Sequence, residues 1–373
     1  MNASSLYEGK FADEAYLRQF DGNEEKAKIY KQEGELWRKE FRPDLIRLDS
    51  VKGAIEKYGL FVAGKGTNGS STLWMDCYGK AHVPMSETSY DYICTILTGF
   101  IYAIEHAITP QNHRINIVVN CAGVKKKQVD ERFLRIITET LSLAYPDSLG
   151  ALGFFNVPPW LSVTYTALYP FIPRQWRDKV FYSATSTSSS AQKNARNQPA
   201  LDSIMPRTEL PKRYGGARND AEFSAASFID SMAKCEAPAG EEERPQMGFP
   251  HFLWIEKLSC PASKQARGVV LRGKMKKPGG IVSIWRRFYF LLRADRHGLY
   301  YFKKDSDMAP QGAVNLARAT AERVSPGDKD YDTKKMHSRG FKVITPLRTF
   351  YFLCKTEKER DMWVSAVNRV INS

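Results

Sequence analysis

Lysine and arginine are concentrated in one stretch of the C-terminal third, and these side chains are the best candidates for binding an anion. Residues 272–304 contain ten of them, opposed by Asp295 alone. Ammonium groups act as point charges and guanidinium groups as planar forks, a combination that suits a headgroup with several phosphates. A solvated basic face is the other interpretation of such a run. The ten bases are Arg272, Lys274, Lys276, Lys277, Arg286, Arg287, Arg293, Arg296, Lys303 and Lys304.

The spacing of these bases predicts a concave site between two strand ends. Side chains alternate along a strand, so Lys274 and Lys276 are expected on one face. The short Pro-Gly-Gly segment at 278–280 then brings either Arg286 or Arg287 back beside them. The aromatic residues of this stretch are contiguous and do not form the spaced stacking platform typical of nucleic-acid binding. We therefore expect no nucleic-acid partner.

The net charge belongs to this part of the chain. The 373 residues carry 55 Lys and Arg against 41 Asp and Glu, a formal net charge of +14. Residues 268–373 hold 22 of these bases and 10 of these acids, so +12 lies there and only +2 on the rest. A polyanionic partner is therefore expected for the C-terminal third and not for the remainder.

The remainder shows no catalytic constellation in its sequence. Gly64, Gly66 and Gly69 spell G-x-G-x-x-G, but the STLWMD that follows reads as a strand, where a dinucleotide site needs a helix. Asn68-Gly69 is a hairpin signal, so a turn between two strands is the stronger interpretation. The six histidines are dispersed and the six cysteines form no C-x-x-C pair. This argues against a metal site and a disulfide framework, and for a reducing compartment.

The elements that must position these residues alternate in type through the first two hundred residues. A helical lead is predicted first, with Ala27, Tyr30, Gly34, Trp37 and Phe41 as its apolar stripe. Strands and helices then alternate, which is the α/β signature, and the strands read as buried on both faces. Strands are predicted at 60–63, 72–76, 115–120, 151–157 and 179–183, and helices at 90–108 and 129–145.

The segment 160–171, WLSVTYTALYPF, stands out because it is apolar on nearly all sides. A helix of this kind is either deeply buried or faces something apolar that is not protein. Its periodicity alone does not choose between a core helix and a lipid-facing one.

The C-terminal third has a different pattern. Residues 217–267 are rich in Pro, Gly and Glu and are predicted mostly as linker. From Gly268, several short strands are followed by one amphipathic helix, which predicts a small β-barrel or sandwich with the helix at one end. Thr356 and Glu359 are spaced as a capping box for that helix, and Trp363 begins its apolar face.

Residues 268–373 resemble a pleckstrin-homology domain. The likeness rests on GKMKK, on WRRFYFLL at 285–292, on GLYYFKK at 298–304 and on RTFYFLC at 348–354. It implies a seven-stranded barrel capped by a helix. In members that bind phosphoinositides, the first two strands and their loop form the basic pocket. That pocket corresponds here to Lys274, Lys276, Lys277, Arg286 and Arg287, and the adjacent arginines leave open which of them faces it.

Residues 11–216 resemble the CRAL-TRIO lipid-binding family, which includes phosphatidylinositol transfer proteins. The likeness rests on YPDSLGALGFFNVPPWLSVTYTALYPFI at 145–172 and on ELPKRYGG at 209–216. It implies an apolar lipid pocket under a gate helix at 160–171, with Arg213 toward the headgroup phosphate. Lys125, Lys126 and Lys127 argue against a choline headgroup. The implied pocket and gate residues are Phe154, Phe155, Trp160, Leu161, Val163, Leu168 and Phe171.

These observations predict an α/β lipid-binding domain with a helical N-terminal lead, plus a β-barrel pleckstrin-homology domain capped by a C-terminal helix. The expected divisions are a lead at 1–50, a lipid-binding domain at 51–216, a linker at 217–267 and the barrel at 268–373. The expected function is non-enzymatic binding and transfer of a phospholipid, with phosphatidylinositol as the candidate ligand. We expect no cofactor or metal, and a cytoplasmic protein that docks peripherally on phosphoinositide membranes. A lipid-sensing scaffold or signalling adaptor without transfer activity is the alternative.

Overall fold

The computed structural model describes residues 7, 9–76, 90–109, 112–124, 131–158, 160, 174–184, 201–236, 258–278, 284–328 and 333–373. Contacts divide the chain into two compact units, one built mainly from residues before 248 and one mainly from residues after it. None of the described helices is long and apolar enough to cross a bilayer.

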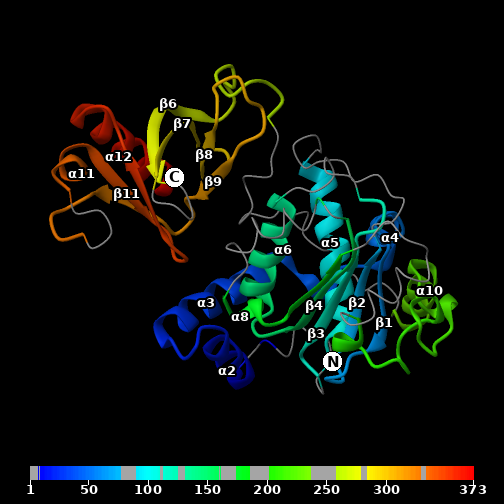
Figure 1. Cartoon of the computed structure of the whole chain (residues 1–373). Helices are drawn as coiled ribbons and strands as arrows, with labels where there is room; N and C mark the ends of the chain where they lie inside the picture. The colour runs from blue at the N-terminus through cyan, green and yellow to red at the C-terminus, as the bar shows by residue number, and fades with distance from the viewer. Residues whose placement is uncertain are drawn as a thin grey trace. The chain divides into compact units, whose positions relative to one another are not determined.

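The N-terminal unit begins with the predicted helical lead (Figure 1). Asn23 caps the second helix by accepting a hydrogen bond from the Lys26 amide, and the predicted stripe residues Trp37 and Phe41 are buried. Gly59 ends the third helix in the left-handed conformation that glycine adopts without strain. These helices are α2 (Gly9–Gln19), α3 (Glu24–Phe41) and α4 (Leu48–Tyr58), with a 3-10 turn at Pro43–Leu45.

A five-stranded sheet forms the centre of this unit, in the order β1-β2-β3-β4-β5. β1 and β2 are antiparallel and joined by the Asn68-Gly69 turn, so the hairpin prediction for the glycine motif is confirmed. The other neighbours are parallel, as the α/β pattern predicts. The strands are β1 (Leu60–Lys65), β2 (Ser71–Asp76), β3 (Ile115–Asn120), β4 (Leu149–Val157) and β5 (Val180–Ala184).

Helices connect the parallel strands: α5 (Tyr90–Ala107) joins β2 to β3, α6 (Glu131–Ala144) joins β3 to β4, and α8 (Arg174–Arg177) precedes β5. A further helix, α10 (Ala225–Cys235), lies inside the predicted linker. It buries Phe228 and Ile229 and packs against α4 and β1. This part of the predicted linker is therefore a folded helix, which is capped by Ser224.

The C-terminal unit is a seven-stranded antiparallel sheet in the order β10-β11-β12-β6-β7-β8-β9, with a helix against it. Within the described residues no ladder joins β9 to β10, so the predicted barrel is open at that seam. Thr356 caps the closing helix: its hydroxyl accepts a hydrogen bond from the Glu359 amide, as predicted. The elements are β6 (Val269–Pro278), β7 (Trp285–Arg293), β8 (Gly298–Phe302), β9 (Gly312–Asn315), β10 (Thr320–Arg323), α11 (Lys334–Arg339), β11 (Gly340–Ile344), β12 (Thr349–Leu353) and α12 (Glu357–Ile371).

Candidate lipid and phosphate sites

One face of the N-terminal sheet is sealed by the chain itself. Side chains of Trp74 and Phe155 point to this face, where Tyr214 stacks on the Trp74 ring at a centroid distance of 6.0 Å and Phe155 meets Tyr214 at 5.0 Å. Phe223 closes the same layer against Trp74 at 5.6 Å. Phe155, predicted for the lipid pocket, is therefore 1% exposed and belongs to a closed aromatic layer.

The opposite face is only partly covered. Met75, Val119 and Phe154 are register partners across three parallel strands, so their side chains share this face. Leu152 and Val180 pair one row further on. Val119, Leu152, Phe154 and Val180 are all half-buried, whereas the strand residues between them on β3 and β4 are buried. The sheet thus presents a row of half-buried apolar side chains on this face.

Helix α5 lies on this partly covered face. A Cβ added at Gly99 of α5 would contact the Leu60 side chain, and Leu60 is the register partner of Met75. Leu97, Phe100, Ile101 and Ile104 of the helix are fully buried. The face is therefore closed over β1 and β2 and more open over β3 to β5.

Several predicted residues lie outside the described part of the chain. Leu161, Val163, Leu168 and Phe171 of the predicted gate are among them, as are Lys125–Lys127. Trp160 is described, and it is helical and half-buried.

Arg213 lies on the sealed side, in a 3-10 turn at Lys212–Tyr214. Its guanidinium donates to the carbonyl oxygens of Asp220 and Phe223 at 3.1 and 2.8 Å. It also lies over the Tyr214 ring, 5.2 Å from the centroid. The structure therefore does not bring Arg213 together with the row of half-buried side chains, and these contacts of its guanidinium hold the chain segment that seals the other face.

The carboxyl ends of the parallel strands carry a polar cluster that the sequence did not reveal. The Asn120 amide donates to the Asp76 carboxylate and to the Tyr214 hydroxyl, at 3.1 and 3.3 Å. The Asn156 amide donates to the Asn120 oxygen at 3.0 Å. Asn156 has a φ of +54°, a conformation that asparagine tolerates better than most residues. The cluster satisfies buried polar groups where three strands end together.

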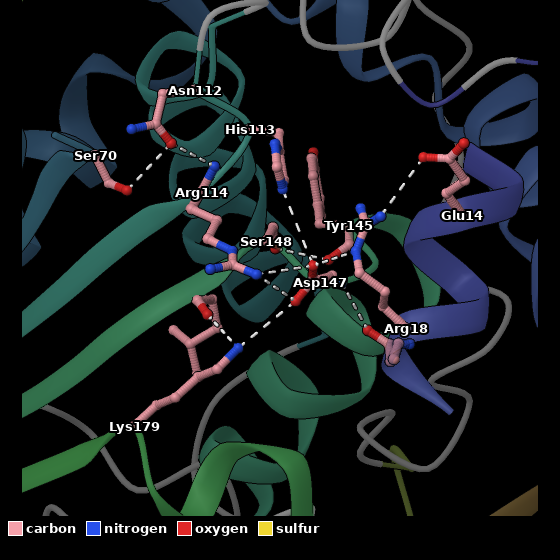
Figure 2. Close-up of polar contacts among 12 residues, drawn as sticks. Glu14, Arg18, Ser70, Asn112, His113, Arg114, Tyr145, Asp147, Ser148 and Lys179 are labelled. Carbon is pink, nitrogen blue, oxygen red and sulfur yellow. Dashed lines mark hydrogen bonds and ion pairs between the residues drawn. The ribbon is translucent and has the colours of Figure 1, made fainter. Parts of the chain in front are cut away.

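Asp147 is the centre of a second cluster, at the amino ends of the strands (Figure 2). It accepts from Arg18 Nε at 2.9 Å and from Arg114 Nη2 at 3.1 Å, and Lys179 Nζ is 3.7 Å away. His113 Nε2 lies 4.0 Å from the same carboxylate. Since Arg18 belongs to α2 and the others lie in the segments just before β3 and β5, this carboxylate fastens the helical lead to the α/β core.

The Asp147 cluster changes the proton affinity of its members. Burial on its own raises the pKa of Asp147, but hydrogen bonds from Arg18 and Arg114 outweigh it and hold that pKa below the usual range. For His113, burial lowers the pKa, and the charges of Arg114 and Arg18 lower it further against the opposing pull of Asp147. Both shifts favour the state in which the carboxylate is charged and the imidazole neutral.

In the C-terminal unit, the predicted basic residues lie on the first hairpin, β6–β7. Lys276 is the register partner of Arg287, and Lys277 that of Arg286. Met275 and its partner Phe288 contact the main core, so Lys277 and Arg286, two positions along each strand, share the core side. Lys276 and Arg287 alternate with them and lie on the outer side. The five predicted residues are therefore divided between two faces.

Comparison with known proteins assigns both units. The CRAL/TRIO domain model matches residues 56–216 and the PH domain model residues 269–372. Patellin-4 of Arabidopsis thaliana is 28% identical over 138 residues, 35% of this chain and 24% of the relative. A PH domain-containing protein of Dictyostelium discoideum is 32% identical over 97 residues, 26% of this chain and 20% of the relative. This chain thus spans less than a quarter of either relative.

A solved structure, the C-terminal PH domain of pleckstrin, is 24% identical, covers 28% of this chain and 99% of that chain, and has a TM-score of 0.24. CRAL/TRIO domains bind lipids, PH domains bind phosphoinositides, and both are typically non-catalytic. Their combination supports lipid binding and membrane docking. The chain therefore contains a CRAL/TRIO domain at residues 56–216, followed by a PH domain at residues 269–372.

Proposed function

We propose that this protein is a non-enzymatic phospholipid carrier that holds one lipid on the partly covered face of its CRAL/TRIO sheet and docks on phosphoinositide membranes through its PH domain. The observation that carries the proposal is the row of half-buried apolar side chains at Val119, Leu152, Phe154 and Val180. Acyl chains laid along that row would exclude water from it, and each buried CH₂ group contributes about 0.8 kcal/mol.

The two modules divide the work in this proposal. The nearly neutral α/β unit holds the lipid, while the basic hairpin of the PH domain brings the protein to an anionic leaflet. Each basic residue close to such a surface contributes about 1 kcal/mol of attraction. Phosphatidylinositol is the candidate ligand, the protein works as a peripheral cytoplasmic protein, and no bond is made or broken.

Lipid extraction and mass spectrometry of the purified full-length protein test the carrier function, followed by a transfer assay between donor and acceptor vesicles. Leu152→Trp would fill the apolar row and is expected to reduce both the co-purified lipid and the transfer rate. Val270→Trp, at an exposed position of β6, is the matched control and should change neither.

Two results would overturn this assignment. If the wild-type protein carries no lipid and transfers none, the carrier function is wrong. If lipid is bound but never transferred, the lipid-sensing adaptor replaces the carrier.

A further inference from the structure

Helix α2 is held on the α/β core by polar contacts near its C-terminal end. Arg18 donates to the Asp147 carboxylate at 2.9 Å, and the Gln19 side-chain oxygen accepts from the Asp147 backbone amide at 3.1 Å. The Gln19 side-chain amide also donates to the Ser142 carbonyl at 2.6 Å. These bonds join α2 to the end of α6 and to the turn that follows it, so α2 can detach only by breaking both bonds to Asp147.

His113 lies at the same junction, beside the Asp147 carboxylate (Figure 2). Its Nε2 atom is 4.0 Å from Asp147 Oδ2, too far for a hydrogen bond. That atom is buried, and the described residues offer it no hydrogen-bond partner. The ring also meets Phe11 of α2 edge-on, with the two centroids 4.9 Å apart. Helix α2 therefore supplies part of the cover that keeps water away from this imidazole.

Positive charge dominates the surroundings of His113. The Asp147 carboxylate attracts a proton to the imidazole, but three permanent cations share that carboxylate. They are Arg18, Arg114 and Lys179, whose nitrogens lie 2.9, 3.1 and 3.7 Å from its oxygens. Glu14, which is 54% exposed, lies 3.7 Å from Arg18 and offsets its charge in part. A proton on His113 would add a fourth positive charge beside a carboxylate that already accepts hydrogen bonds from two arginines.

Detachment of α2 reverses both conditions. The imidazole loses the Phe11 ring that covers it, and Arg18 moves away with the helix, so the ring binds a proton near its ordinary pKa of about 6.5. While α2 is docked, burial and the neighbouring cations hold the pKa of His113 below that value, against the pull of Asp147. The detached state therefore binds the proton first as pH falls. Docking of α2 is strongest above about pH 7 and weakens as pH falls below about 6.5.

We propose that Arg18, His113 and Asp147 form an acid-released clasp, in which a proton on His113 detaches helix α2 while the α/β core stays folded. The clasp responds to proton concentration wherever the protein meets it. An anionic leaflet with a surface potential of about −30 mV concentrates protons about threefold at its surface. If the protein docks on such a leaflet, as proposed above, contact with the membrane would itself favour release of the helix.

Hydrogen–deuterium exchange of the full-length protein, measured by mass spectrometry without vesicles, tests the clasp independently of membrane docking. The protection of the α2 amides is compared at about pH 7.5 and about pH 5.5 with that of α12, a helix of the other unit, which corrects for the intrinsic effect of pH on exchange. In the wild type this ratio should fall at the lower pH by at most about tenfold, the limit for one proton gained at an ordinary histidine pKa. Helix α4, in the same unit as α2, should keep its protection relative to α12.

His113→Phe keeps an aromatic ring beside Phe11 but cannot bind a proton, so its α2 ratio should be the same at both pH values. Arg18→Gln is a second variant at the same junction. It should lower the protection of α2 at both pH values, because a bond to Asp147 is lost. It should also reduce the fall with pH, because the protonated imidazole then faces one cation fewer.

The matched control is His106→Phe, an exposed histidine of α5 whose ring contacts Tyr102, 4.2 Å away between centroids. This variant should respond to pH like the wild type. If the α2 ratio does not fall at the lower pH in the wild type, or falls equally in His113→Phe, the inference is wrong. If α4 loses protection together with α2, the whole unit unfolds in acid and the clasp does not exist.

Discussion

Replacing Arg38 should unfold the N-terminal unit far more readily than replacing other charges of helix α3. The Arg38 guanidinium donates to Glu105 at 3.1 Å and to the Ala144 carbonyl at 2.9 Å. It lies between two aromatic rings, 4.6 Å from the centroid of Tyr7 and 4.7 Å from that of Tyr145. The side chains of Arg38 and Glu105 are only 10% and 6% exposed. A single cation of α3 therefore joins Tyr7, α5, the end of α6 and the turn that follows α6.

The size of the effect follows from burial. Arg38→Met keeps most of the aliphatic stem but leaves the Glu105 carboxylate buried without this cation. Breaking one partner of a buried ion pair costs about 3–5 kcal/mol. Lost cation–π contacts add about 1 kcal/mol. A total near 5 kcal/mol is comparable with the whole stability of a domain, which is about 5–15 kcal/mol.

Urea unfolding of the full-length protein, followed by tryptophan fluorescence, measures this loss. Because the chain has two compact units, two transitions are expected, and only that of the N-terminal unit should move. Lys31→Met on the same helix is the matched control: Lys31 pairs with Asp13 at 2.7 Å, but that partner is 61% exposed. An exposed pair contributes about 0–1 kcal/mol, so this transition should hardly shift.

The double variant Arg38→Met with Glu105→Gln decides the mechanism. The Tyr145 hydroxyl donates to the Glu105 carboxylate at 2.6 Å, and a glutamine oxygen can accept that bond without a charge. At least half of the lost stability should return. If the single change costs less than about 1 kcal/mol, or if the double variant is less stable than the single one, burial of the pair is not what stabilises this junction.

Three other predictions concern stability. His113→Phe should flatten the pH dependence of N-terminal unfolding between about pH 7 and 5. Because the pKa of His113 is lowered in the folded protein, the unfolded chain binds the proton first, so the wild type loses stability as pH falls below about 6.5. An unchanged slope of unfolding free energy against pH would exclude this histidine as the cause. Gly53→Ala should stabilise α4 by about 0.5–1 kcal/mol, because the added methyl group meets nothing within 4 Å. Gly34→Ala should destabilise α3, because its Cβ would overlap the Tyr16 hydroxyl and the Leu143 carbonyl. The melting temperatures of the two variants should therefore shift in opposite directions. Thr356→Ala should cost about 1 kcal/mol in the C-terminal transition, and no shift there would show that the cap is not needed.

Local chemistry made part of this structure predictable. Asn68-Gly69 predicts a tight turn whatever surrounds it. Thr356 and Glu359, three residues apart, predict the beginning of a helix. The α/β order follows from apolar bursts separated by helical stripes. Each of these signals lies within a few residues of the feature that it produces.

The remaining features depend on contacts between distant residues. Asp147 follows a proline in a short turn, and nothing nearby shows that Arg18, Arg114 and Lys179 converge on it. Which face of the β6–β7 hairpin Arg286 and Arg287 occupy depends on the pairing register of the two strands, and a shift of one residue would exchange them. Phe154 and Phe155 are neighbours of one residue type, and only the fold separates a half-buried face from a sealed one.

The attachment of the helical lead to distant residues also affects when the lead can dock during synthesis of the chain. Tyr16 donates to the Leu143 carbonyl and Arg18 pairs with Asp147, across 127 and 129 residues. A ribosome adding about 5–20 residues per second needs roughly 6–26 s to make that stretch. During this interval the Trp37 side chain lacks the Tyr145 ring that it contacts in the folded protein. The lead is therefore made well before the turn on which it docks, and the nascent chain leaves this surface of the lead uncovered until that turn has been made.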